Sequence, residues 1–199
     1  QRPVVIVNCA SASGPFVNRL SGPKRIVVTA TRSGVEQNYA RFGKYFAEAI
    51  GSPDSDLDHD GEVSVHEAFL RASSGVRLFY ESESRLATEH ALIDDNGDGK
   101  GTPASMFRGV RPNAKAKDGV GLDGAAALRV TLAPAGGRLP FTRQEIADRD
   151  SIEHELASLR ATADKSDEQT LDAALLPLLI RLAKIYQAAQ ARAATEGDE

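Results

Sequence analysis

Two short runs of β-branched residues near the N-terminus limit the fold of this 199-residue chain more than any other feature. Residues 3–8 (PVVIVN) form a continuous apolar run, which is typical of a strand buried on both faces, and residues 24–31 (KRIVVTAT) predict a second buried strand. A small-residue turn, a short helix at 16–20 and a break at 21–23 separate them. Because a crossover of this kind joins parallel strands with right-handed chirality, the sequence predicts a βαβ unit in an α/β domain.

Apolar residues at helical spacing predict two helices in the middle of the chain. The first covers residues 36–50, and the second begins near Ser64 and continues toward residue 80, with a weak point at 73–75. Residues 107–124 are rich in Gly, Lys and Asp and predict a loop, and 128–132 (LRVTL) predicts an edge strand.

The last third of the chain has helical character. A heptad-like stripe runs through Leu171, Leu175, Leu178, Leu182, Ile185 and Ala189. Pro177 predicts a kink or a helix start, and residues 164–169 predict a turn. We therefore expect an α-helical hairpin at 141–195 after an α/β domain at 1–135. The hairpin either packs on the domain, associates with a second copy or binds a protein partner.

Charge and composition exclude some classes of protein. The chain has 24 Lys and Arg against 28 Asp and Glu, a net charge of −4, which argues against a nucleic-acid partner held by overall basic charge. No apolar run approaches the roughly 18 residues of a membrane span. One Cys allows no internal disulfide.

One motif is specific: residues 56–67 (DLDHDGEVSVHE) match the twelve-residue calcium loop of an EF-hand. Carboxylates stand at positions 1, 3, 5 and 12, as Asp56, Asp58, Asp60 and Glu67. Gly61 stands at position 6, where the backbone must turn sharply. Calcium takes six to eight oxygen ligands, so we expect the Asp side chains to converge on one ion and Glu67 to bind it with both oxygens. Glu62 can add its backbone carbonyl.

The alternative for this loop is a helix cap without metal. Ser64 and Glu67 fit the S-x-x-E capping box, which accounts for these two residues but not for the three Asp and Gly61. Without metal the acidic side chains repel one another, so a bound ion should stabilise the fold. His59 and His66 fall at positions without ligand function, and we expect them to be exposed. A loop of moderate calcium affinity favours an extracytoplasmic location.

A second acidic loop at 94–99 (DDNGDG) matches the motif only in part. Asp94, Asn96 and Asp98 stand at positions 1, 3 and 5, but Gly101 replaces the apolar residue and Ser105 replaces the acid at position 12. The loop is therefore either a weak second metal site or a turn shaped by Asx and Gly residues. Because EF-hand sensors usually work as coupled pairs, we expect a structural calcium ion rather than a sensor.

Cys9 is a candidate nucleophile because it follows a predicted buried parallel strand, where active sites are common. A catalytic Cys needs a base, and the spacing pairs none of the four His residues with it. The alternative is a small buried hydrophobic side chain.

The segments VIVNCASASGPFVNRL and KRIVVTATRSGVEQN resemble the central part of the caspase-like fold, in the branch near legumain and bacterial caspase-like peptidases. The resemblance covers roughly residues 3–100 and implies the C-terminal part of a three-layer sheet with parallel strands. In that family a strand ends in an acid, one residue, the nucleophilic Cys, one residue and Ser-Gly. Some bacterial relatives carry an acidic Asp/Gly loop where DLDHDGEVSVHEAF stands here.

The chain departs from this family where the chemistry would occur. Matching Ser13-Gly14 to the family's Ser-Gly places Ser11 at the nucleophile position and Cys9 at the acid position. The family's catalytic His precedes the Cys, and no His stands among the eight residues before Cys9. We therefore expect a calcium-binding, catalytically incomplete caspase-like domain. The alternatives are a piece of an active cysteine or serine peptidase whose His lies upstream, and a scaffold that dimerises through its C-terminal helices.

Overall fold

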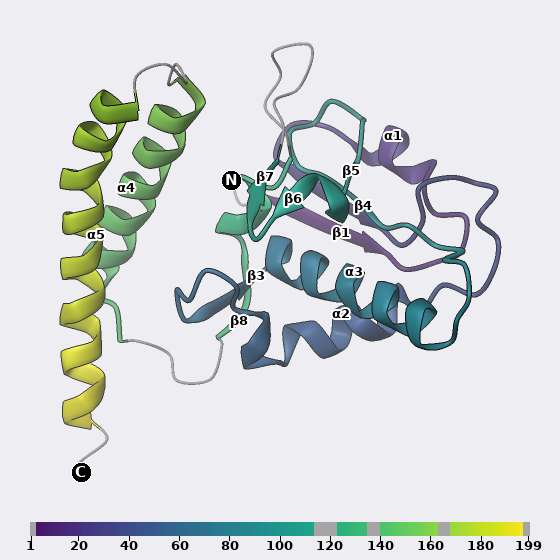
Figure 1. Ribbon diagram of the computed structural model, residues 1–199, viewed down its shortest axis with the longest axis horizontal. Helices are drawn as coiled ribbons and strands as arrows, with labels where there is room; N and C mark the ends of the chain where they lie inside the picture. Colours follow the sequence, from purple (N-terminus) through teal and green to yellow (C-terminus); the bar gives the residue numbers. More distant parts are fainter. Residues whose placement is uncertain (1–2, 114–122, 135–139, 163–167, 197–199) are drawn as a thin grey trace. The chain divides into compact units, whose positions relative to one another are not determined.

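The computed structural model describes residues 3–113, 123–134, 140–162 and 168–196 (Figure 1). It divides into a unit at Gln1–Gly137 and a unit at Arg138–Glu199, and each is described by itself. The first unit is mixed α/β, and the second is helical.

A four-stranded sheet forms the centre of the first unit, in the order β1-β2-β4-β5. Its strands are β1 (Val4–Asn8), β2 (Arg25–Thr29), β4 (Leu92–Asp94) and β5 (Thr102–Pro103). As predicted, β1 and β2 pair in parallel across α1 (Phe16–Leu20). The expectation of a parallel sheet is wrong beyond β2, because β4 pairs antiparallel with β2, and β5 antiparallel with β4. The sheet is therefore mixed.

Two helices, α2 (Phe42–Ile50) and α3 (Val65–Ser82), cover one face of this sheet, and α1 lies on the other side (Figure 1). Ile26 and Val28 of β2 are buried in the core that α2 and α3 complete with Phe42, Phe46 and Phe69. Val27 between them is buried as well. The predicted burial of β2 on both faces is confirmed. The same prediction for β1 is wrong, because this strand lies at the edge of the sheet, with Val4 55% exposed and the other residues only half-buried.

Helix α2 begins at Phe42 and not at residue 36 as predicted. The Glu89 carboxylate accepts hydrogen bonds from the backbone N–H groups of Arg41 and Phe42, with the shortest distances 2.8 and 3.0 Å. Glu36 accepts from the N–H groups of Arg32 and His90. These carboxylates hold the segment before α2 out of a helical conformation, and Tyr39, which contributed to the predicted period, is 78% exposed.

Helix α3 continues without interruption through the predicted weak point at 73–75. Gly75 lies against α2, and a Cβ added there would stand 2.6 Å from Cδ1 of Tyr45. Glycine is therefore present because the two helices approach closely, although its helix propensity is poor.

Gly75→Ala should destabilise the fold by roughly 1–3 kcal/mol, as expected for overpacking. At an open helical position the same change would stabilise by about 1 kcal/mol. Urea unfolding measures the difference, and the neighbouring Ser74→Ala serves as the matched control with a small effect. Tyr45→Ala combined with Gly75→Ala should recover part of the loss. A Gly75→Ala chain more stable than wild type would contradict the close approach.

Short elements complete the first unit. Strand β3 (Glu62–Ser64) pairs antiparallel with β8 (Thr131–Pro134), and β6 (Phe107–Arg108) pairs with β7 (Arg111–Pro112). Single 3₁₀ turns cover Pro53–Ser55, Ala104–Met106 and Ala127–Arg129. The edge strand predicted at 128–132 therefore lies a few residues later. Residues 107–113 of the predicted loop contain the two short strands, and residues 114–122 lie outside the described part.

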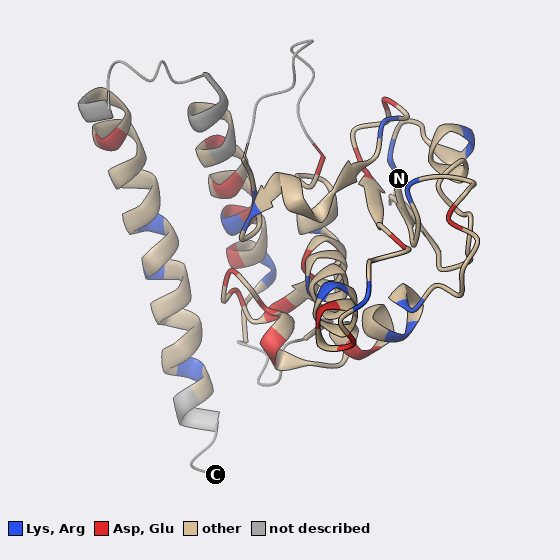
Figure 2. Ribbon diagram, turned by 45° about the vertical axis from the view of Figure 1, so that its right-hand side comes forward, with Lys and Arg blue, Asp and Glu red and all other residues tan. Residues whose placement is uncertain are grey.

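The second unit is a pair of helices, α4 (Arg143–Thr162) and α5 (Glu168–Glu196). The core of this unit contains two residues of the predicted stripe, Leu175 and Leu178 of α5. They pack with Ile152 and Leu156 of α4. Pro177 lies inside α5, and the helix continues past it. Figure 2 shows charges of both signs along α4 and few on α5. Most of the predicted turn at 164–169 lies outside the described residues.

Among the helices that the structure describes, none is both long and apolar enough to cross a membrane.

Candidate metal centre

The loop between α2 and α3 gathers three carboxylates. Asp56, Asp58 and Asp60 each bring a carboxylate oxygen to within 4.8 Å of the others. Among the described residues, this is the one group of acidic, His or Cys side chains that meets this spacing. The predicted convergence of the three Asp side chains is therefore present in the fold.

Backbone amides of the same loop orient these carboxylates. Asp56 accepts hydrogen bonds from the N–H groups of Asp60 (3.0 Å) and Gly61 (2.9 Å). Asp58 accepts from the N–H of Asp60 (3.3 Å), and Asp60 accepts from the N–H of Glu62 (2.8 Å). Gly61 has a φ of +86°, in the left-handed region where a side chain is unfavourable. The tight turn thus brings alternate side chains to one side of the loop.

Glu67 closes the loop from the first turn of α3, and only 1% of it is exposed. Its Oε1 accepts from the N–H groups of Leu57 (2.7 Å) and Asp58 (3.2 Å), at the start of the loop. Its Oε2 accepts from the N–H (2.9 Å) and the Oγ (2.7 Å) of Ser64. Ser64 Oγ accepts in turn from the N–H of Glu67, which completes the predicted capping box. The capping box needs only Oε2 of Glu67, so it does not account for the two hydrogen bonds that Oε1 accepts at the start of the loop.

Glu62 does not add its side chain to the cluster. It lies in β3, and its carboxylate accepts a hydrogen bond from Oγ1 of Thr131 on the paired strand β8 (2.5 Å). The role predicted for Glu62 concerns its backbone carbonyl, so this side-chain contact leaves that prediction open.

His66 is completely buried, so the expectation that it is exposed is wrong. Position 11 of the loop already belongs to α3 and faces the core, where the His66 ring lies 4.6 Å from that of Phe107. Burial lowers the pKa of His66 to about 4, against a contact with the Val110 backbone that raises it. The ring is therefore neutral near pH 7. His59, in contrast, is exposed as expected.

The second acidic loop begins at the end of β4. Asp94 accepts from the N–H of Gly97 (3.0 Å), Asn96 from that of Asp98 (2.8 Å) and Asp98 from that of Lys100 (2.7 Å). These are the turns predicted for Asx and Gly residues. Ser105 lies at the wall of a separate cavity.

Two further buried carboxylates, Asp95 and Asp123, adjoin the second loop and were not predicted. Burial raises the pKa of Asp95, and raises that of Asp123 to about 6. Asp123 comes from a distant part of the sequence, so no local pattern indicates it.

The candidate nucleophiles stand at the end of β1. Ser11 Oγ donates to the backbone carbonyl of Asn38 (2.7 Å), and Cys9 lies beside Gly43 of α2. Cys9 is accessible, but its partial burial raises the pKa of the thiol. In the part of the chain that is described, no His is hydrogen-bonded to either residue. Both candidates therefore follow β1, and no hydrogen bond between described residues joins either of them to a base.

Ser13 and Gly14, on which the family resemblance depends, have a clear structural role. Ser13 Oγ lies 3.3 Å from Oγ1 of Thr31, and both are buried. A Cβ at Gly14 would stand 2.3 Å from the backbone of Arg32. The pair therefore joins the turn after β1 to the turn after β2.

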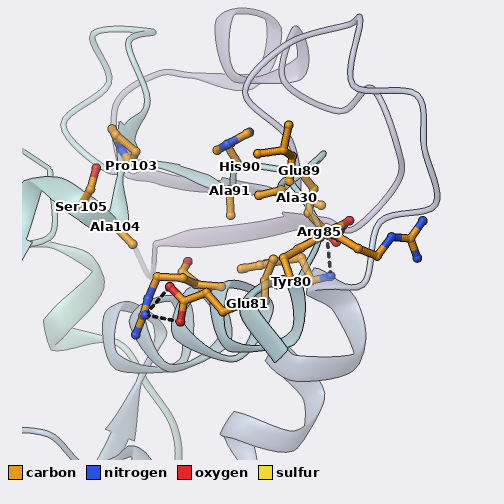
Figure 3. A pocket seen from close by; sticks show the side chains of 16 residues that line it. Ala30, Tyr80, Glu81, Arg85, Glu89, His90, Ala91, Pro103, Ala104 and Ser105 are labelled. Atoms are coloured by element: carbon orange, nitrogen blue, oxygen red, sulfur yellow. Dashed lines mark hydrogen bonds and ion pairs between the residues drawn. The ribbon is translucent and has the colours of Figure 1, made fainter. Parts of the chain in front are cut away.

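A cavity of about 380 Å³ lies between α3 and the segments at 85–91 and 103–105 (Figure 3). His90 lines it, and its Nδ1 lies 2.6 Å from Oε1 of Glu36. Glu89, also at the cavity, is 3% exposed and already accepts hydrogen bonds from Arg41, Phe42 and Tyr80. Its carboxylate fixes the start of α2.

Comparison with known proteins gives no family model, no curated protein and no solved structure that matches the chain.

The raised pKa of Cys9 predicts slow alkylation. The rate of reaction with iodoacetamide should rise with pH through a midpoint above about 8.5, the value of a free thiol. The urea-unfolded chain is the matched control and should show the ordinary midpoint. A midpoint below 7.5 in the folded chain would indicate an activated thiolate and would contradict this account of Cys9.

Proposed function

We propose that the chain binds a calcium ion in the loop at 56–67 and that the ion has a structural role. The observation that carries the proposal is the approach of the Asp56, Asp58 and Asp60 carboxylates to within 4.8 Å of one another. Glu67 supports it, because Oε1 of this side chain already reaches the N–H groups at the start of the loop.

The donor set favours a hard divalent cation. All four side chains offer carboxylate oxygens, which suit calcium and magnesium rather than zinc or copper. The twelve-residue spacing, with Gly at position 6 and Glu at position 12, favours calcium, since its larger coordination number accommodates a bidentate Glu. Neutralising three adjacent carboxylates should stabilise the folded chain.

A structural role follows from the elements that the loop connects. The 3₁₀ turn at Pro53–Ser55 leads into the loop, and β3 and α3 follow directly. Val63 and Val65 flank Ser64 and are completely buried in the main core. An ion held by residues at both ends of the loop would therefore fix the entry of α3 into this core.

We further propose that the first unit is a caspase-like domain that is catalytically incomplete. The parallel β1–α1–β2 arrangement and the contact of Ser13 with Thr31 support the relation. The hydrogen bond from Ser11 to the Asn38 carbonyl and the raised pKa of Cys9 support the lack of an activated nucleophile.

Glu67→Gln tests the calcium site. Gln preserves a capping box, so the helix start should persist, while the loss of a carboxylate should weaken calcium binding at this loop by at least about tenfold. Thermal melts of chelator-treated protein over a calcium series measure the effect through the calcium-dependent rise in Tm.

Asp54→Asn is the matched control. The substitution removes one charge close to the loop, at a side chain that is 82% exposed. It should respond to calcium as the wild type does. Equal calcium dependence of Glu67→Gln and wild type would restrict Glu67 to helix capping and would contradict the proposal.

A further inference from the structure

Two hydrogen bonds of the loop that begins at Asp56 recur in the loop that begins at Asp94, although the carboxylates at position 1 accept from different N–H groups. In each, the side chain at position 3 accepts from the N–H at position 5, and the side chain at position 5 accepts from the N–H at position 7. The bonds are Asp60 N–H to Asp58 and Glu62 N–H to Asp60 in the first loop, and Asp98 N–H to Asn96 and Lys100 N–H to Asp98 in the second. The two loops therefore share the hydrogen bonds accepted by the side chains at positions 3 and 5, the second of which comes from the N–H at position 7.

Asp123 makes the contacts in the second loop that Glu67 makes in the first. Its Oδ1 accepts from the N–H groups at positions 2 and 3, Asp95 (2.9 Å) and Asn96 (3.2 Å). Its Oδ2 accepts from the hydroxyl at position 9, Thr102 (2.5 Å). Glu67 binds the same three positions of its own loop, through Leu57, Asp58 and Ser64. The carboxylate missing at Ser105 is thus supplied from outside the loop.

Asp95 holds this remote carboxylate in place. Its Oδ2 accepts from the N–H groups of Ala126 (2.8 Å) and Ala127 (2.7 Å), in the turn that follows Asp123. Asp123 is 1% exposed, so it is as deeply buried as Glu67.

A separate observation at position 1 points to a ligand. Asp94 is completely buried, and its Oδ2 has no hydrogen-bond partner among the residues that the structure describes. Its Oδ1 accepts from Gly97 within the loop, so the carboxylate is directed to the loop. A buried carboxylate oxygen without a donor is unfavourable unless a cation compensates it.

We propose that the loop at 94–102 is a second calcium site, of split construction, in which Asp123 takes the place of the position-12 acid. The ligands would be Asp94, Asn96, Asp98 and Asp123, all of which offer oxygen. An amide replaces one carboxylate, and Asp123 is shorter than Glu67, so the second site should bind calcium more weakly than the first. This inference does not depend on the first site.

The test counts calcium ions per full chain by equilibrium dialysis of chelator-treated protein against radioactive calcium. Wild type should bind two ions. Asp94→Asn and Asp123→Asn should each bind one, Glu67→Gln should bind one with the weaker affinity, and Glu67→Gln with Asp94→Asn should bind none. Glu83→Gln, at an exposed position, is the control and should bind two. Asp94→Asn keeps the test valid if Asp123→Asn fails to fold, because it keeps the side-chain size and removes the buried charge.

The outcomes separate the two sites. One ion in wild type, lost in Glu67→Gln and kept in Asp94→Asn, would overturn the second site and leave the first. One ion lost in Asp94→Asn and kept in Glu67→Gln would support the second site and overturn the first. No binding would overturn both, and two ions in folded Asp123→Asn would overturn the role of Asp123.

Discussion

A buried carboxylate that accepts several hydrogen bonds holds the first unit together where its loops meet its core. Glu67 joins the start of the acidic loop to Ser64 and to the first turn of α3. Hydrogen bonds to a charged group are stronger than neutral ones, and a buried carboxylate without them would be costly. This side chain therefore fixes the start of α3 beside Val63 and Val65, which are buried in the core. The same side chain is the one that would complete a calcium site.

A buried carboxylate accepts hydrogen bonds from the start of each acidic loop. In the first loop it comes from the loop itself, and in the second it comes from a distant part of the sequence. Glu67 lies eleven residues after Asp56, so the spacing alone predicted its position. Asp123 performs the same task for the second loop from far along the chain, and only the fold brings it there. Sequence spacing reveals contacts that one turn of chain can make. It cannot reveal a contact that depends on where a later segment returns.

The same distinction explains the other results. The strands β1 and β2, the short α1 between them and the capped start of α3 were predicted, because periodicity and capping residues are local signals. The start of α2 was not, since Glu89 fixes it from 47 residues away. The position of His66 within the calcium-loop motif predicts exposure, whereas the residue belongs to the core face of α3. The antiparallel direction of β4 follows from the path of the chain. A strand of three residues is too short for its sequence to indicate its direction in the sheet.

In the calcium-loaded chain that we propose, the carboxylates of Asp56, Asp58, Asp60 and Glu67 surround one ion. A crystal structure of the calcium-loaded chain, with anomalous data collected at long wavelength, tests it most directly. We expect an anomalous peak at about 2.3–2.6 Å from oxygens of these side chains. No peak at saturating calcium, with Glu67 bonded only to the N–H groups of Leu57, Asp58 and Ser64, would contradict it.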